Sequence, residues 1–176
     1  MPKVIRFSLS EASIDNAIQE LDRYIKDLDE KAKKLAEKIA ERIAWSASSG
    51  FSHAIADDIF TGGERRNGNV SVTVEENGNL FVVLAEGKDA VFIEFGAGVY
   101  YNGSAGSSPH PKGSGLGYTI GEYGKGQGKK NVWALPGSTN EDPILTHGTP
   151  AAMPMYRGLQ DALSVIRDLA KEVFGG

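Results

Sequence analysis

Lysines, tyrosines and glycines gather in one stretch of this chain, residues 96–130, and these residues are its best candidates for chemistry. Eleven of the 22 glycines lie between Gly96 and Gly128, and the stretch holds four lysines but a single acid, Glu122. It therefore carries a local charge of +3 while the remainder of the chain carries −7. Such a composition suits contact with phosphate groups or with an acidic protein surface.

The spacing within this stretch disfavours a nucleotide-binding loop. Gly124–Lys130 does not match G-x-x-x-x-G-K-[ST], because Tyr123 stands where the first glycine belongs and no Ser or Thr follows the lysine. Three interpretations of the basic, tyrosine-rich loop stay open. It contacts nucleic acid, it docks on an acidic protein surface with its tyrosines as anchors, or it is a solvated loop without a partner.

Hydrolytic and metal-dependent chemistry find little support in the residue types. There is no cysteine, no G-x-S-x-G and no H-E-x-x-H, and His53, His110 and His147 are far apart in sequence. We expect these histidines to be surface or capping residues. The sequence therefore predicts a protein that is not an enzyme, with no catalytic residues, no cofactor and no metal site.

Composition limits the class of protein further. A net charge of −4 disfavours a whole-surface nucleic-acid binder. The sequence has no run of about 18 apolar residues, so we expect no membrane span. The first residues, Met1-Pro2-Lys3, contain no apolar signal region, so we expect the chain to act in a cytoplasm. Its 176 residues suit a single domain, 1–176, with a core of its own.

A long helix is predicted from Glu11 to Ala47, because eight apolar residues step by 4 and 3 and Ser46–Gly50 is typical of a helix end. Such a helix is about 55 Å long, so one end projects from a compact body or the helix bends. The flanking heptad positions place no opposite charges across a parallel homodimer. We therefore favour packing of the apolar seam on the chain's own sheet over pairing with another subunit. The seam residues are Ile14, Ile18, Leu21, Ile25, Leu28, Ala32, Leu35 and Ile39.

The remaining elements are short strands and a closing helix. Alternation predicts a strand at Lys3–Leu9, and Asn77-Gly78-Asn79 predicts a hairpin that joins strands beginning at Val70 and Leu80. A third strand is expected at Ala90–Phe95. A last strand is expected at Asn131–Leu135, before a loop at 136–147. The final amphipathic helix begins at Pro150 or Pro154 and ends at Gly175-Gly176.

These elements define an α+β fold class. A long N-terminal helix and a C-terminal helix pack on a small antiparallel β-sheet, and the glycine-rich loop 96–130 is inserted before the last strand and the C-terminal helix. Glu94 lies near the end of the apolar run Ala90–Phe95. We expect its side chain to point to solvent while Phe92 or Phe95 faces the core, and the alternative is an acid at a functional site.

Two short runs in this order resemble those of a known family. Phe92-Ile93-Glu94-Phe95-Gly96 and Met153-Pro154-Met155-Tyr156-Arg157, together with the long helix and the hairpin, resemble the tail-component or tail-completion proteins of long-tailed bacteriophages. These proteins join or complete the neck between head and tail. The resemblance marks Phe92, Glu94, Phe95, Gly96, Pro154, Tyr156 and Arg157 as structural residues of the family pattern.

The resemblance implies a structural virion protein of the phage or prophage neck, located in the virion and, during assembly, in the host bacterial cytoplasm. Its expected partners are other neck and tail proteins and copies of itself in a ring of six, with DNA contact possible but not favoured. We expect the ring contacts to use the projecting part of the long helix and the basic loop. The alternative function is a nucleic-acid-binding module that uses the same loop. The interface residues expected in the loop are Tyr100, Tyr101, Tyr118, Tyr123, Lys125, Lys129 and Lys130.

Overall fold

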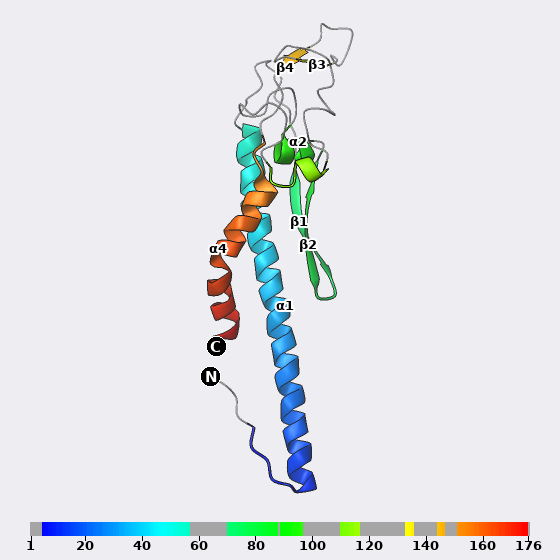
Figure 1. Ribbon diagram of the computed structural model, residues 1–176, viewed down its shortest axis with the longest axis vertical. Coiled ribbons are helices and arrows are strands. Elements are labelled where there is room, and N and C mark those ends of the chain that lie inside the picture. The colour runs from blue at the N-terminus through cyan, green and yellow to red at the C-terminus, as the bar shows by residue number, and fades with distance from the viewer. Residues whose placement is uncertain are drawn as a thin grey trace.

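The computed structural model combines one very long helix, a C-terminal helix and a small antiparallel sheet, which makes the fold α+β (Figure 1). It describes residues 5–56, 70–87, 89–96, 110–116, 133–135, 144–146 and 151–175. The elements are α1 (Glu11–Ala56), β1 (Ser71–Asn77), β2 (Leu80–Glu86), α2 (Ala90–Phe95), a 3-10 turn (Ser114–Leu116), β3 (Trp133–Leu135), β4 (Ile144–Thr146) and α4 (Pro154–Phe174).

Helix α1 runs nine residues beyond its predicted end at Ala47, through the whole of Ser46–Gly50. The small residues there serve a close helix crossing, not a helix stop. A Cβ atom built on Gly158 of α4 would lie 2.9 Å from the carbonyl oxygen of Ile43, and one built on Gly50 would lie 2.9 Å from Cβ of Pro154. Small side chains on both helices therefore let the two backbones approach.

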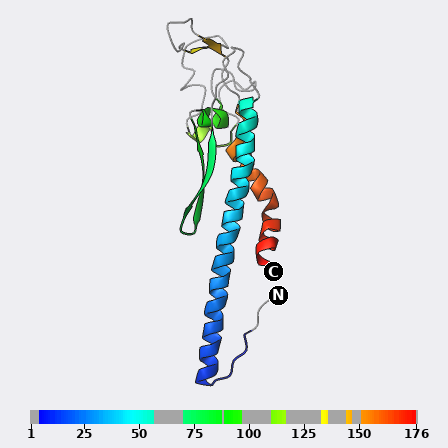
Figure 2. The same ribbon diagram turned by 180° about the vertical axis from the view of Figure 1, so that it is seen from behind.

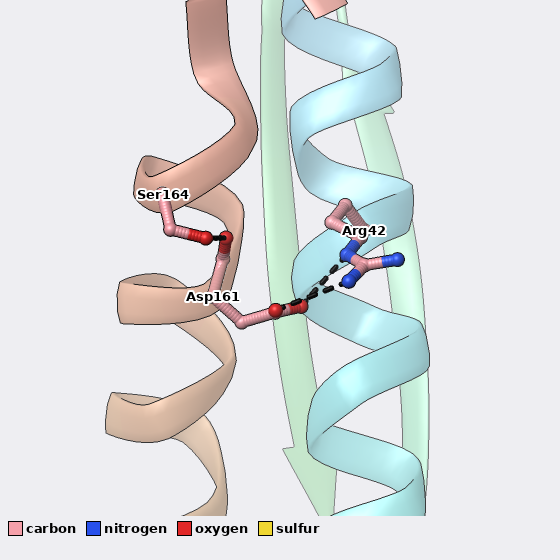
Figure 3. Close-up of polar contacts among 3 residues, drawn as sticks. All are labelled: Arg42, Asp161 and Ser164. Atoms are coloured by element: carbon pink, nitrogen blue, oxygen red, sulfur yellow. Dashed lines mark hydrogen bonds and ion pairs between the residues drawn. The ribbon is translucent and has the colours of Figure 1, made fainter. Parts of the chain in front are cut away.

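Ion pairs flank this crossing along the remainder of α4. The Arg42 guanidinium donates two hydrogen bonds to the Asp161 carboxylate, at 2.7 and 3.0 Å, in a bidentate geometry (Figure 3). Nearer the end of α4, Lys38 bonds Glu172 at 2.9 Å, and this hydrogen bond lowers the pKa of Glu172 and raises that of Lys38. As a result, α4 lies along the upper half of α1, as both views show (Figures 1 and 2).

The hairpin lies on another side of the same half of α1. Strands β1 and β2 pair antiparallel from Ser71↔Glu86 to Asn77↔Leu80, as predicted, and Gly78 begins the two-residue turn with φ +64. An ion pair between Lys33 and Glu76 ties the end of the hairpin to α1. A small core forms where the hairpin, α1 and α2 meet, around the buried residues Phe51, Ala90 and Ile93.

Three predictions about strands are wrong. Ala90–Phe95 is the helix α2, because helical spacing turns both Ala90 and Ile93 toward Phe51. Residues 5–9 of the predicted first strand form no strand. The third error is β4, which lies in the predicted loop 136–147 and pairs with β3, within the predicted last strand, in a separate two-stranded sheet. Two prolines were candidates for opening the final helix, and the helix begins at Pro154.

The apolar seam of α1 divides into two halves. Leu35 and Ile39 are half-buried beside the hairpin and α4, but Ile14, Ile18, Leu21, Ile25 and Leu28 are each 38–54% exposed. The prediction that the seam packs on the chain's own sheet is wrong for this first half. Both the hairpin and α4 end short of it, so the lower half of α1 projects from the body (Figures 1 and 2).

The α1–α4 crossing generates a prediction for Gly158→Ala. Helix propensity alone would stabilise α4 by up to about 1 kcal/mol. We expect instead a net loss of about 1–2 kcal/mol in the free energy of unfolding, because the new methyl group meets the backbone of α1 and overpacking costs about 1–3 kcal/mol. Urea unfolding measures the change. The control is Gly115→Ala, where a Cβ meets nothing within 4 Å, and equal stability of the two variants would contradict the close crossing.

Candidate functional site

The most elaborate polar arrangement among the described residues centres on the carboxylate of Glu94. This residue lies in the last turn of α2 and is only 6% exposed. Its Oε2 accepts a hydrogen bond from the backbone N–H of Met155 at 2.8 Å, and its Oε1 accepts one from the N–H of Tyr156 at 2.9 Å. The expectation that Glu94 points to solvent is therefore wrong. Its side chain caps the N-terminus of α4 from a different element.

The sequence at the start of α4 explains why a cap from elsewhere is needed. The N-cap residue Met153 makes no capping bond with its own side chain and has left-handed dihedrals, φ 54 and ψ 45. Pro154 follows at the first helical position and has no N–H to satisfy. The next two N–H groups bond Glu94, and Arg157 N–H bonds the Met153 carbonyl at 2.9 Å. The negative charge also complements the positive end of the helix dipole.

A buried histidine completes the arrangement. His110, 7% exposed, places Nε2 3.2 Å from Oε1 of Glu94, while its Nδ1 accepts the backbone N–H of Lys112 at 3.0 Å. Because Nδ1 accepts a hydrogen bond, the proton of a neutral ring lies on Nε2 and is donated to Glu94. The expectation of a surface histidine is wrong at this position. The ring also packs on Phe95, 4.4 Å between centroids, and meets Tyr156 edge-on at 5.3 Å.

Gly96 fixes the exit of the chain from this cluster. It is buried, its N–H donates to the carbonyl of Phe92 at 2.8 Å, and its φ of +80 is one that other residues rarely adopt. On the other side, the N–H of Ala152 donates to the carbonyl of Ile93 at 2.8 Å. Helix α2 therefore bonds both Gly96, where the chain leaves the cluster, and Ala152, just before α4 begins.

An apolar groove with a volume of about 670 Å³ lies next to this cluster. Its walls come from α1, β2, α2 and the first turns of α4, and Glu94, His110 and Lys112 are the polar residues among them. The other lining residues are mostly aliphatic or aromatic and include Ile43, Phe81, Val83, Phe95, Tyr156 and Leu159.

The structure brings together most of the residues that the sequence marked as a family pattern. Glu94 accepts the N–H of Tyr156, and Pro154 opens the helix that these residues cap. Phe95 joins them through His110, and Gly96 and Phe92 close α2. The side chain of Arg157 is exposed on α4. His110 was missed, because Pro109-His110-Pro111 carries no signal of burial. The predicted interface residues Tyr100, Tyr101, Tyr118, Tyr123, Lys125, Lys129 and Lys130 lie outside the described residues.

The hydrogen bonds define what this cluster does. Both oxygens of Glu94 accept main-chain N–H groups, and both ring nitrogens of His110 are engaged. These contacts join α2, the His110 segment and the start of α4, and the cluster is here called the junction. Among the described residues, no group of three or more His, Cys, Asp or Glu side chains is placed to hold a metal ion.

Comparison of the chain with protein-family models, with curated proteins and with solved structures finds no match. None of the helices in the described part of the chain is long and apolar enough to cross a membrane.

The junction generates a prediction for Glu94→Gln. One amide oxygen replaces two charged acceptors, and the amide N–H₂ group faces a backbone donor. We expect a loss of about 1–3 kcal/mol in the free energy of unfolding, since hydrogen bonds to charged groups contribute in that range. Urea unfolding followed by helix circular dichroism measures it. Glu86→Gln, at an exposed position at the end of β2, is the control, and an unchanged midpoint for Glu94→Gln would contradict the capping role.

Proposed function

We propose that this chain is a structural assembly protein of the neck of a long-tailed phage or prophage, where it joins or completes the connection between head and tail. The observation that carries the proposal is the junction at Glu94. The two runs of the resemblance, 92–96 and 153–157, lie about sixty residues apart in sequence and meet in one hydrogen-bonded unit. A pattern that serves one physical purpose supports the resemblance better than two unrelated matches would.

The shape of the molecule and its surface agree with an assembly role. An elongated body with a projecting helix offers separate surfaces for different neighbours, as subunits of a ring require. The exposed apolar residues of that helix are unusual for a protein that acts alone. We propose that the chain works as a subunit of a ring, six by resemblance, together with other neck and tail proteins.

Deletion of the gene from its phage or prophage tests this proposal by electron microscopy of the particles. We expect DNA-filled heads lying beside separate tails if the protein joins the two, or tails of irregular length if it terminates them. The control is expression of the wild-type chain from a plasmid, which should restore complete particles. Normal, infectious particles without the gene would overturn the proposal, and the basic loop would then be tested for nucleic-acid binding.

The basic loop is tested in the same system with the triple variant Lys125→Glu, Lys129→Glu and Lys130→Glu. We expect this variant to fold normally but to restore few complete particles, because reversed charge repels an acidic docking surface. The matched control, Lys34→Glu, Arg167→Glu and Lys171→Glu, makes the same charge change at exposed helix positions. Equal restoration by both variants would remove the loop from the proposed assembly contacts.

A further inference from the structure

The first half of α1 presents an apolar stripe without a partner among the described residues. The stripe, here called the distal seam, consists of Ile14, Ile18, Leu21, Ile25 and Leu28, each 38–54% exposed. Residues 5–10 run back beside α1 in Figures 1 and 2, and Ala17, next to the seam, is only 9% exposed. The seam itself stays uncovered. Five apolar residues in strict heptad spacing are the surface that a second amphipathic helix binds.

One edge of the distal seam is lined by carboxylates. Asp15, Asp22 and Asp29, here called the acidic column, occupy successive heptad positions directly beside the seam. Within the described part of the chain, none of the three has a hydrogen bond or an ion pair, whereas Asp27 bonds Lys31 and Glu30 contacts Lys26. The stretch Glu11–Glu30 holds seven acids and only two basic residues, Arg23 and Lys26.

This charge pattern selects the chemistry of the occupant. Antiparallel pairing of two copies would set the acidic column against itself, and parallel pairing would oppose it with Ala17 and Tyr24, which carry no charge. A nucleic acid or an anionic membrane would be repelled by the same carboxylates. A helix with basic residues every seventh position would place each of them beside an aspartate, in the geometry that sets partner choice in coiled coils.

We propose that the distal seam and the acidic column form a docking surface for an amphipathic helix of another protein, one whose apolar stripe is bordered by Lys or Arg at seven-residue spacing. This deepens the proposed function, since the partner there is another neck or tail protein. The seam spans about 21 Å of helix, from Ile14 to Leu28, so a partner helix contacts it over about two heptads. We expect a single contact of this length to bind weakly, and repetition around a ring to strengthen it.

The test uses the full chain and two synthetic helical peptides about four heptads long. Both peptides carry Ile at a and Leu at d; one has Lys and the other Glu at e and g. Fluorescence anisotropy of labelled peptide measures the dissociation constant. We expect micromolar binding of the lysine peptide, at least tenfold weaker binding of the glutamate peptide, and a several-fold loss of affinity between about 50 and 500 mM salt.

Variants with matched controls separate the two parts of the surface. Ile25→Lys, in the seam, should abolish binding, while Leu80→Lys, at an equally exposed apolar site on the hairpin, should leave it unchanged. Asp15→Lys, Asp22→Lys and Asp29→Lys together should reverse the preference toward the glutamate peptide. Glu20→Lys, Asp27→Lys and Glu30→Lys change the net charge equally on the outer face of the helix and should retain the preference for lysine.

Three results would overturn the inference. Binding of neither peptide would show that the seam is not a docking surface, and equal binding of both would show that the acidic column does not select the partner. Sedimentation equilibrium of the chain alone gives the third: if Ile25→Lys dissolves a dimer, the occupant is a second copy. Each result concerns the isolated chain. It is therefore distinguishable from a failure of the proposed function, which the deletion particles report.

Discussion

The carboxylate of Glu94 is the contact on which the arrangement of the body depends. It satisfies the first free N–H groups of α4 from a helix sixty residues earlier, and it does so in a buried place where unpaired donors would be costly. Because α2 packs on Phe51 of α1, the same bond fixes α4 relative to α1. The start of α4 in turn sets where Gly158 meets α1, and the backbones of the two helices lie close together at that residue. A strained N-cap at Met153 is held by these surroundings.

The two halves of helix α1 differ in what they contact. Its second half changes from a seam of Ile and Leu to a face of Ala and Gly, and this half carries α4, the hairpin and α2. Its first half keeps the regular seam but has neither helix nor strand of the described chain beside it. Tertiary packing, more than intrinsic propensity, normally stabilises a helix. The exposed half of α1 therefore depends on the packed half to nucleate the helix.

Sequence reasoning identified the fold class and the hairpin turn at Gly78, and it narrowed the start of α4 to Pro150 or Pro154, because each depends on local chemistry. It failed where tertiary contacts decide. Ala90–Phe95 is short and apolar, so its period does not distinguish a strand from a helix, and the contact of Ile93 with Phe51 settles it. The Ser46–Gly50 run has the composition of a helix end but the geometry of a helix crossing. The resemblance marked Glu94 and Tyr156 as residues of one pattern. No sequence signal near either residue indicated that they bond each other or that His110 is buried between them.

The junction also explains how the chain accommodates its long middle. The chain leaves the cluster at Gly96, whose φ of +80 favours glycine. It comes back to the same helix at Ala152, whose N–H bonds the carbonyl of Ile93. The two ends of the intervening stretch are therefore held close together, whatever its length. The entropic cost of closing a flexible loop rises by only about 0.6 kcal/mol for each doubling of its length. We expect a body built this way to tolerate large changes in the inserted stretch, provided that Glu94, Gly96, His110 and the start of α4 keep their contacts. The projecting half of α1 makes none of these contacts, so its residues are free to change without loss of the junction.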